Sequence, residues 1–337
     1  MSGMQVDLSQ LRVPVVAAPM LLVSGPELVI AACRTGIAGS FPTANPRGAG
    51  ELEQWLTRIE SALADARADG LRPAPYLPNL IVHKSNPRLA EDLDALTAHQ
   101  PAAVITSVGS PAAVVGRLHD AGIAVWSDVA SVRHAQRAAE AGVDGLILLA
   151  AGAGGQTGWA NPFAFVRAVR AQFDGVLVVS GGQSDGWTLW AAQALGCDLG
   201  YMGTRFIATA EANAPQAYKD MIVASELDDI HLTTAFTGLE TNMMRKSMVA
   251  QGLNPDDFGR DRKSFAMAGL TSAAGPGTGS SAAASSGPRR YRDIWSAGHS
   301  ASGVRDVSSV AAVVDRLAAE YAQARAATAA RLDGKQA

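Results

Sequence analysis

Short runs of apolar residues recur along the chain, and within them apolar and polar positions do not alternate. From the third run onward they return at intervals of roughly 20–30 residues, which is typical of one strand followed by one helix. Runs that are apolar throughout indicate strands buried on both faces, as in a parallel sheet. With the segment GIAGS counted as the second strand, the predicted strands begin near Val13, Gly36, Tyr76, Ala102, Ile123, Asp144, Gly175 and Asp198.

Eight such strands favour a closed TIM (β/α)8 barrel, an α/β fold, over an open doubly wound sheet. The loop after the first strand holds no GxGxxG sequence, so a dinucleotide-binding sheet is not indicated. Helices between the strands are expected where a cap-forming residue stands beside a proline. These predicted starts are Ser24 with Pro26, Asn86 with Pro87, Ser110 with Pro111, and Asn161 with Pro162.

The alternation of strand and helix stops after Thr204, and this change divides the chain. Residues 1–204 and 305–330 are predicted to form the barrel, and the second range supplies a last helix packed against the first and seventh helices. Residues 205–270 are expected to form a helical insertion that covers the barrel mouth and contributes to substrate binding. Residues 271–304 begin with a stretch rich in Gly, Ser and Ala, so we expect a flexible connection and tail there.

Composition narrows the class of protein. The 337 residues carry a formal net charge of −3, and the 28 Lys and Arg residues are scattered, so no nucleic-acid-binding face is expected. No apolar run reaches the ~18 residues that a membrane span needs, and no leader segment is recognised at the N-terminus. Cys33 and Cys197 stand far apart without metal-ligand spacing, which fits a reducing cytoplasm and predicts no metal site.

Glycine turns follow the seventh and eighth predicted strands, where (β/α)8 barrels usually bind phosphate. Glycine lets backbone N–H groups approach phosphate oxygens closely, and the helix after the first turn would add a favourable dipole. The alternative, tight turns that only pack helix against strand, is weaker because both turns occur together in the expected loops. The two turns are Ser180-Gly181-Gly182 and Met202-Gly203-Thr204.

Further candidates lie at the ends of other predicted strands. Asn79 interrupts an apolar strand, and a buried amide left unpaired costs about 1–3 kcal/mol, so it should bond a polar ligand or, as the alternative, a neighbouring strand. Gly154, Gly155 and Gln156 lie in a glycine-rich loop after the sixth strand, which a flexible connection explains nearly as well. His83 follows the third strand and is a candidate acid or base, although a hydrogen bond to a loop carbonyl explains it equally. The ends of the first and fourth strands add Ala18, Pro19, Met20 and Ser107.

Several strings spread over nearly the whole chain resemble those of the nitronate monooxygenase family, formerly called 2-nitropropane dioxygenases. They are VVAAPM, NLIVHKSNPRL, AAEAGVDGLIL, GAGGQTG, ALGCDLGYMGTRFIAT, FTGLETNMMRKS and DIWSAG. The resemblance implies an FMN-dependent oxidoreductase whose first strand faces the flavin ring and whose glycine turns hold the flavin phosphate. It places the FMN contacts on Pro19, Met20, Asn79, Gly154, Gly182, Tyr201, Met202, Gly203 and Thr204.

The sequence departs from this family in the loop after the sixth strand. The family usually reads AGGH there, with the histidine as the base that removes a proton from a nitroalkane, whereas this chain has Gln156. A neutral amide orients a substrate or stabilises an anion but takes no proton near pH 7. Proton abstraction from a neutral nitroalkane is therefore not expected of Gln156, whereas oxidation of an already ionised nitronate needs no such base.

Three functions on a small-molecule substrate are compatible with these residues, in descending order. The first is oxidation of alkyl nitronates with O2 as co-substrate. The second is reduction of an enoyl thioester or quinone with NAD(P)H, and the third is FMN binding with little chemistry. A homodimer is left open, and substrate selectivity is expected to lie in the insertion and in the tail around Trp295.

Overall fold

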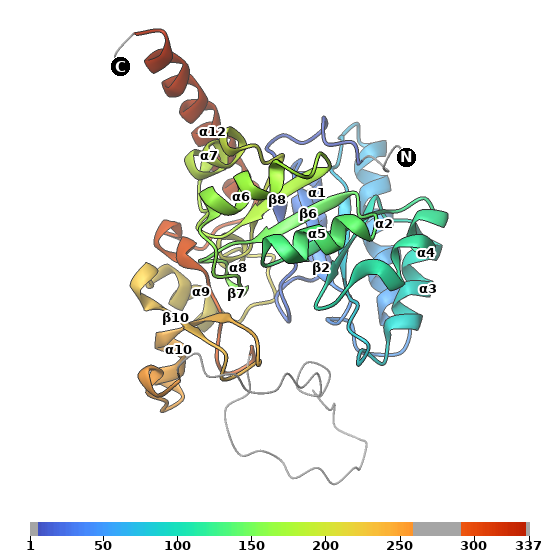
Figure 1. Ribbon diagram of the computed structural model, residues 1–337, viewed down its shortest axis with the longest axis horizontal. Coiled ribbons are helices and arrows are strands. Elements are labelled where there is room, and N and C mark those ends of the chain that lie inside the picture. Colours follow the sequence, from blue (N-terminus) through green and yellow to red (C-terminus); the bar gives the residue numbers. More distant parts are fainter. Residues whose placement is uncertain (1–5, 259–290, 335–337) are drawn as a thin grey trace.

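The computed structural model describes residues 6–258 and 291–334. Its main feature is a closed barrel of eight parallel strands in which each strand pairs with the next and the last pairs with the first (Figure 1). The predicted (β/α)8 barrel is therefore confirmed. Its strands are β1 (Val15–Ala17), β2 (Ala38–Pro42), β3 (Tyr76–Ile81), β4 (Ala103–Ser107), β5 (Ala124–Val129), β6 (Gly145–Leu149), β8 (Val176–Ser180) and β9 (Leu199–Met202).

Both faces of the barrel strands are buried, which explains why apolar and polar residues do not alternate along them. In β5, for example, Val125 packs beneath the surrounding helices, whereas Trp126 points into the barrel interior. Ile105 and Ile147 from the neighbouring strands pack with Trp126 in that interior. The barrel is thus filled by side chains along its axis, and a ligand has access only at its ends.

Helices surround the barrel, and proline marks several of their starts. Asn161 caps its helix as predicted, because its side chain accepts a hydrogen bond from the N–H of Phe163 at 2.9 Å. The other predicted caps need correction: Gly25 rather than Ser24 precedes the first helix, the helix expected after Asn86 begins at Leu89, and Ser110 caps only a short 3-10 helix. The elements are α1 (Pro26–Arg34), α2 (Glu51–Ala68), α3 (Leu89–His99), η1 (Pro111–Ala113), α4 (Val115–Asp120), α5 (Val132–Glu140), α6 (Pro162–Arg170) and α7 (Gly186–Leu195).

The chain returns to the barrel through α12 (Val310–Leu332). This helix packs against α1 and α7, as predicted for the last barrel helix. Val310, Val313, Val314 and Leu317 are buried near its start, whereas its carboxyl-terminal part projects beyond the barrel (Figure 1). The seam between the first and seventh helices is therefore closed by the amino-terminal half of α12.

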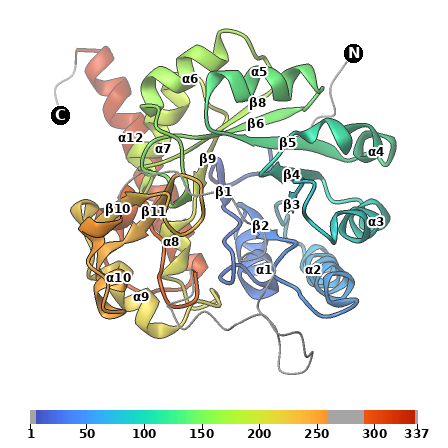
Figure 2. The ribbon, with the colours of Figure 1, turned by 60° about the horizontal axis from the view of Figure 1, so that its bottom comes forward.

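The segment between β9 and α12 contains strands as well as helices, so the prediction of a purely helical insertion is corrected. Two of its strands form an antiparallel sheet with the two-residue strand β7 (Gly155–Gln156) of the barrel loop. The segment lies on one side of the barrel, next to β1 and β9 (Figure 2). Its elements are α8 (Thr204–Ile207), α9 (Gln216–Val223), η2 (Leu227–Asp229), β10 (Ile230–Thr233), β11 (Thr241–Met244), α10 (Arg245–Ala250), η3 (Pro255–Asp257) and η4 (His299–Gly303).

The flexible connection predicted for residues 271–304 falls partly outside the described residues, as does the end of the insertion predicted for residues 205–270. Residues 291–304 are described, and they pack tightly. The ring of Trp295 stacks on Tyr218 with ring centroids 4.9 Å apart, and the N–H of His299 donates to the carbonyl of Gly152 at 2.9 Å. This part of the tail is therefore a structural contact of the barrel loop.

Cys33 and Cys197 are both free and buried, and burial raises the pKa of each thiol to about 12. Within residues 6–258 and 291–334, no group of His, Cys, Asp or Glu side chains is arranged to hold a metal ion. The helices in those ranges include none that is long and apolar enough to cross a membrane.

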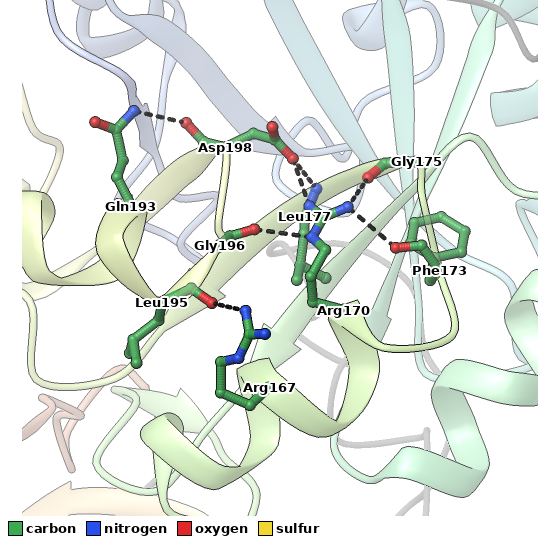
Figure 3. Close-up of polar contacts among 9 residues, drawn as sticks. All are labelled: Arg167, Arg170, Phe173, Gly175, Leu177, Gln193, Leu195, Gly196 and Asp198. Atoms are coloured by element: carbon green, nitrogen blue, oxygen red, sulfur yellow. Dashed lines mark hydrogen bonds and ion pairs between the residues drawn. The ribbon is translucent and has the colours of Figure 1, made fainter.

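Arg170 joins several loops at the amino-terminal ends of β8 and β9 (Figure 3). Its guanidinium donates to the carbonyls of Phe173, Gly175 and Gly196 and pairs with Asp198 at 2.8 Å. The Asp198 carboxylate also accepts the N–H of Leu177 at 2.7 Å, where β8 begins. This network lies at the end of the barrel opposite to the strands' carboxyl ends, so we expect it to act on stability.

Replacing Arg170 with methionine is expected to lower the free energy of unfolding by about 2–4 kcal/mol, because three carbonyls and a carboxylate lose their donor. The matched control is Arg167→Met, since Arg167 donates only to the carbonyl of Leu195 among the hydrogen bonds described for its side chain. Urea unfolding followed by circular dichroism measures both variants. Equal losses in the two variants would contradict a special role for the Arg170 network.

Candidate active site

A cavity opens where the barrel strands end in their carboxyl-terminal residues, and we call it the mouth cavity. It is lined by residues at or just after the carboxyl ends of all eight barrel strands, together with residues of the insertion and tail. The sequence-predicted residues that line it are Ala18, Pro19, Met20, Asn79, Ser107, Gly154, Gly155, Gln156, Tyr201, Gly203 and Thr204.

Four predicted residues do not line the mouth cavity. The side chain of Met202 is buried between the barrel and its helices, because inward and outward positions alternate and Tyr201 takes the inward one. Gly181 and Gly182 follow the lining residue Ser180 but stand outside the lining themselves. His83 is also outside, and its Nδ1 lies 2.7 Å from the hydroxyl of Ser85. The structure therefore gives no support to His83 as an acid or base.

The turn after β1 is built by polar side chains that the sequence reasoning did not identify. The hydroxyl of Ser24 accepts the N–H of Met20 at 3.0 Å and donates to the carbonyl of Ala18 at 3.3 Å. Asn45 accepts the N–H of Leu22 at 2.9 Å, and Leu22 has a φ of 65°, a conformation that is unfavourable for a branched residue. These bonds hold the turn in the shape that presents Pro19 and Met20 to the cavity.

Asn79 finds its hydrogen-bond partners on the neighbouring strand. Its Nδ2 donates to the carbonyl of Ile105 at 3.3 Å, and its Oδ1 accepts the hydroxyl of Ser107 at 3.2 Å. The expectation that Asn79 needs a ligand is therefore corrected in favour of the alternative. The side chain still lines the cavity, and an amide has a second N–H, so a ligand there could receive one further bond.

The loop that carries Gln156 is held from outside the barrel. Gly155 and Gln156 pair with Asn242 and Thr241 of β11, and the Asn242 side chain donates to the carbonyl of Ala153 at 2.7 Å. A Cβ on Gly154 would lie 2.8 Å from the backbone nitrogen of Gly298. The glycine at 154 is therefore required by packing against the tail, and this packing fixes the position of Gln156 at the cavity wall.

The expected phosphate site can be tested on the two glycine turns. Gly182 has a φ of +73°, is exposed, and has no atom within 4 Å of where a Cβ would stand, whereas a Cβ on Gly203 would make only ordinary contacts. Thr204 Oγ accepts the N–H of Gly298 at 2.9 Å and keeps its own proton to donate. These open backbones next to the cavity fit the phosphate of FMN.

The helix dipole expected at this site needs correction. The first helix after the Gly182 turn, α7, has its amino end already engaged. Asp185 accepts the N–H of Thr188 at 2.8 Å, and Glu320 of α12 accepts the N–H of Gly186 at 3.0 Å. Two carboxylates at this end leave little attraction for another anion, so the turns themselves must provide the phosphate contacts.

Two unpartnered polar groups in the mouth cavity were not identified as a pair from the sequence. Asp128, at the end of β5, has an enclosed Oδ1 without a hydrogen-bond partner among the described residues, and the Tyr201 hydroxyl is in the same condition. Burial raises the pKa of Asp128 to about 7. Burial, and next to it the charge of Asp128, raises the pKa of Tyr201 well above its ordinary value. The signal for Asp128 was present, because a carboxylate interrupts an apolar strand as Asn79 does.

Other lining residues come from the insertion and tail, whose path the sequence could not predict. Tyr218 contributes from α9, and its hydroxyl donates to the carbonyl of Ser296 and accepts the N–H of the same residue at 3.2 Å. Thr237 and Thr241 line the cavity with their hydroxyls 2.8 Å apart. Among the residues that the structure describes, no histidine lines the mouth cavity. Gln156 is thus not replaced by a histidine from another of these elements.

Comparison with known proteins agrees with this fold. A relative from Paraburkholderia phytofirmans, a nitronate monooxygenase, is 27% identical over 280 residues, with 72% of this chain and 76% of the relative covered. A relative from Rhodococcus jostii, named (3aS,4S,5R,7aS)-5-hydroxy-7a-methyl-1-oxo-octahydro-1H-indene-4-carboxyl-CoA dehydrogenase, is 26% identical, with 70% of this chain and 64% of the relative covered. The solved structure of a nitroalkane oxidase from Streptomyces ansochromogenes has the same fold, with a TM-score of 0.70, 21% identity, and 95% and 99% of the two chains covered.

A family model matches more than half of the chain. The model described as nitronate monooxygenase matches residues 77–320, which include most barrel strands, the Gln156 loop, both glycine turns and the insertion. The chain therefore belongs to the nitronate monooxygenase family of flavin-dependent oxidoreductases.

Proposed function

We propose that this protein binds FMN in the mouth cavity and oxidises alkyl nitronates with O2. The observation that carries the proposal is the composition of the cavity wall, in which the open glycine turn at Gly203 accompanies the neutral amide of Gln156. Gln156 has hydrogen-bond donors for an anion, and no histidine lines the wall among the described residues. A substrate that is already an anion needs binding and orientation here but no base.

The cofactor would be held by backbone more than by charge. Gly182, Gly203 and Thr204 would contact the phosphate, and the turn of Pro19 and Met20 would face the ring. Bound FMN supplies electron transfer from the substrate and onward to O2. The apolar side chains of Met20, Leu149 and Ile207 in the lining would limit the access of water to the bound substrate.

Gln156 would orient the nitronate through its amide N–H groups. A nitronate carries its negative charge on the two nitro oxygens, and hydrogen bonds to charged groups contribute about 1.5–3 kcal/mol each. The backbone of the Gln156 loop is held by its pairing with β11, so the residue stands at the cavity wall without a substrate. Its removal should therefore weaken the reaction of the anion rather than change flavin binding.

A second candidate function is redox chemistry on a CoA thioester. The observation in its favour is that two relatives at 26% and 27% identity are named as dehydrogenases of a carboxyl-CoA compound. A reductase of an enoyl thioester would take its electrons from NADH or NADPH, whereas a nitronate oxidase takes them from its substrate. Reduction of the flavin in the absence of O2 therefore separates the two functions.

The test uses the purified protein with its cofactor. We expect one FMN per chain on denaturation and rapid anaerobic bleaching of the flavin by the nitronate of nitroethane. Gln156→Leu should slow this bleaching about 10–100-fold, in line with the loss of one hydrogen bond to a charged group. Gln172→Leu is the matched control, because the hydrogen bonds described for the Gln172 side chain are with Gln136 and with the carbonyl of Ala168.

The alternative results are equally specific. Bleaching by NADH or NADPH with no reaction of the nitronate would replace the proposed function by the thioester or quinone reductase. Absence of both reactions would leave an FMN-binding protein of low activity. Release of FAD, or of no flavin, would contradict the assigned cofactor.

A further inference from the structure

Among the acidic residues that the structure describes, Asp128 alone lines the mouth cavity. It occupies the end of β5, where the side chain is partly exposed to the mouth cavity while Oδ1 is enclosed without a partner. Asp128 also lines a second, adjoining cavity, which we call the side cavity. Gln156, Leu149 and Val108 border both cavities with it, so Asp128 and Gln156 face common space.

A purely structural role does not explain Asp128. The two buried aspartates of the described barrel are held by partners: Asp92 pairs with Arg88 at 2.9 Å, and Asp144 accepts the N–H of Val125 at 2.8 Å. An enclosed carboxyl oxygen without a partner, such as Oδ1 of Asp128, is costly to the folded protein. Such groups are found at functional sites, where the cost is offset by chemistry with a ligand.

The other groups that face these cavities are poor bases. Tyr201 and Tyr218 line the mouth cavity, and burial raises the pKa of both phenols, so they remain protonated and do not serve as bases near neutral pH. Gln156 is neutral. His134 and Arg137 of α5 line the side cavity, where both residues are exposed to solvent. Besides Asp128, Tyr201 and Tyr218, the remaining titratable residue in the described lining of the mouth cavity is Tyr291. Asp128 is thus the one described carboxylate that the mouth cavity offers as a proton acceptor.

We infer that Asp128 is the catalytic base that removes the α-proton from a neutral nitroalkane, so that the protein generates the nitronate it oxidises. This inference rests on the proposed function for its substrate class. The carbon–hydrogen bond breaks, the proton passes to a carboxylate oxygen of Asp128, and the electron pair spreads onto the nitro oxygens, where Gln156 can donate. The step consumes no oxidant or reductant.

This arrangement divides between two residues what a single histidine does elsewhere in the family. Gln156 binds the developing negative charge, and Asp128 receives the proton and becomes neutral. A base with a pKa of about 7 is well matched to this task near neutral pH. A large fraction of the Asp128 side chains is then ionised and can accept the α-proton, and the carboxyl group is basic enough to keep that proton after the transfer. Gln156 does not take the proton, and with Asp128 as the base the protein would use both the neutral nitroalkane and the ionised nitronate.

The test measures proton exchange, which needs no turnover of the flavin. FMN-loaded protein is kept anaerobic in D2O with neutral nitroethane, and proton NMR follows the loss of the α-hydrogen signal. Wild-type protein should accelerate the loss above buffer, and Asp128→Asn should reduce this acceleration about 10²–10⁴-fold, the usual contribution of a general base. Asp128→Glu, which keeps a carboxylate, should restore part of it.

Two controls and a second readout accompany the exchange. His134→Gln removes the histidine of the side cavity, and Asp94→Asn makes the same chemical change on the surface of α3, where Asp94 pairs with Arg117. Both should exchange like wild type. Flavin bleaching by nitroethane that has been ionised beforehand should persist in Asp128→Asn, because that substrate has already lost its proton.

The outcomes separate the base from the proposed function. No exchange by wild type, or full exchange by Asp128→Asn, overturns the assignment of the base. Equal losses of exchange and of bleaching by the ionised substrate would make Asp128 a positioning residue and also overturn it. Exchange that depends on Asp128, without bleaching by the nitronate, would support the base and contradict nitronate oxidation.

Discussion

Replacing Gly203 with glutamate is expected to abolish FMN binding while the barrel stays folded. Gly203 lines the mouth cavity and follows β9, and a Cβ there would lie 3.5 Å from the Met20 sulfur and 3.7 Å from the Ala18 Cβ, which are ordinary contacts. The damage therefore comes from the carboxylate. Two unit charges about 4 Å apart repel by about 4 kcal/mol at an effective dielectric of about 20, which is about three orders of magnitude in Kd.

Gly182 provides an independent arm of the same test. Its φ of +73° strains any side chain, so Gly182→Asp is compared with Gly182→Asn, which has the same shape, tolerates this conformation and carries no charge. Gly203→Ala is the corresponding control at the other turn. Flavin content after gel filtration measures binding, and circular dichroism confirms folding. If both acidic variants keep their flavin, the phosphate lies elsewhere, and if the neutral controls lose it equally, charge is not the reason.

The barrel could be predicted from sequence because burial on both strand faces leaves a local signal. Each strand is an apolar run, and the turn after it is marked by Gly, Pro or Asp. The insertion offers no such signal. Thr241–Met244 mixes polar residues with methionines, and it becomes a strand only through pairing with Ile230–Thr233 and with Gly155–Gln156. Such pairing depends on residues distant in the sequence, which local propensity does not report.

The candidate site, like the fold, could be predicted from the sequence only in part. Gly203, Thr204 and Tyr201 were placed correctly at the cavity because strand ends of one barrel face share a rim. The side chain of Met202 points away from the cavity, because inward and outward side chains alternate along β9. His83 was chosen for its residue type and its position after β3, but it does not line the cavity, although Ile81 at the end of β3 does. Asp128 was missed although the argument used for Asn79 applies to it.

The tail could not have been placed from its composition. Residues 291–304 adjoin a stretch rich in Gly, Ser and Ala, and this neighbourhood suggested flexibility. In the structure, Gly298 packs against Gly154 so closely that a Cβ on either glycine would meet the other backbone. The same short segment stacks Trp295 on Tyr218. These contacts mean that the tail positions the Gln156 loop, a function that only the three-dimensional arrangement reveals.

The stability of the flavin-free protein should depend on pH through Asp128. Its pKa is about 7 in the folded protein, raised by burial from an ordinary value of 3.8. Between these two values the folded state binds more protons than the unfolded state, so the stability from this group falls as pH rises. It is fully present below about pH 4 and is lost by about pH 8, a total of about 4 kcal/mol.

Asp128→Asn removes this titration and keeps the size of the side chain. Relative to wild type, the variant should therefore gain stability from about pH 4 to about pH 8 by about 4 kcal/mol, and the gain should level off above the folded pKa. Other titrating groups, such as Asp92, are common to both proteins and cancel in the difference. Urea unfolding at each pH supplies the measurement, and Asp94→Asn, on the surface, should show no comparable trend. A difference that stays constant, or that shrinks as pH rises, would show that the folded protein holds Asp128 ionised at no cost, and the carboxylate would then need a partner that this cavity does not provide.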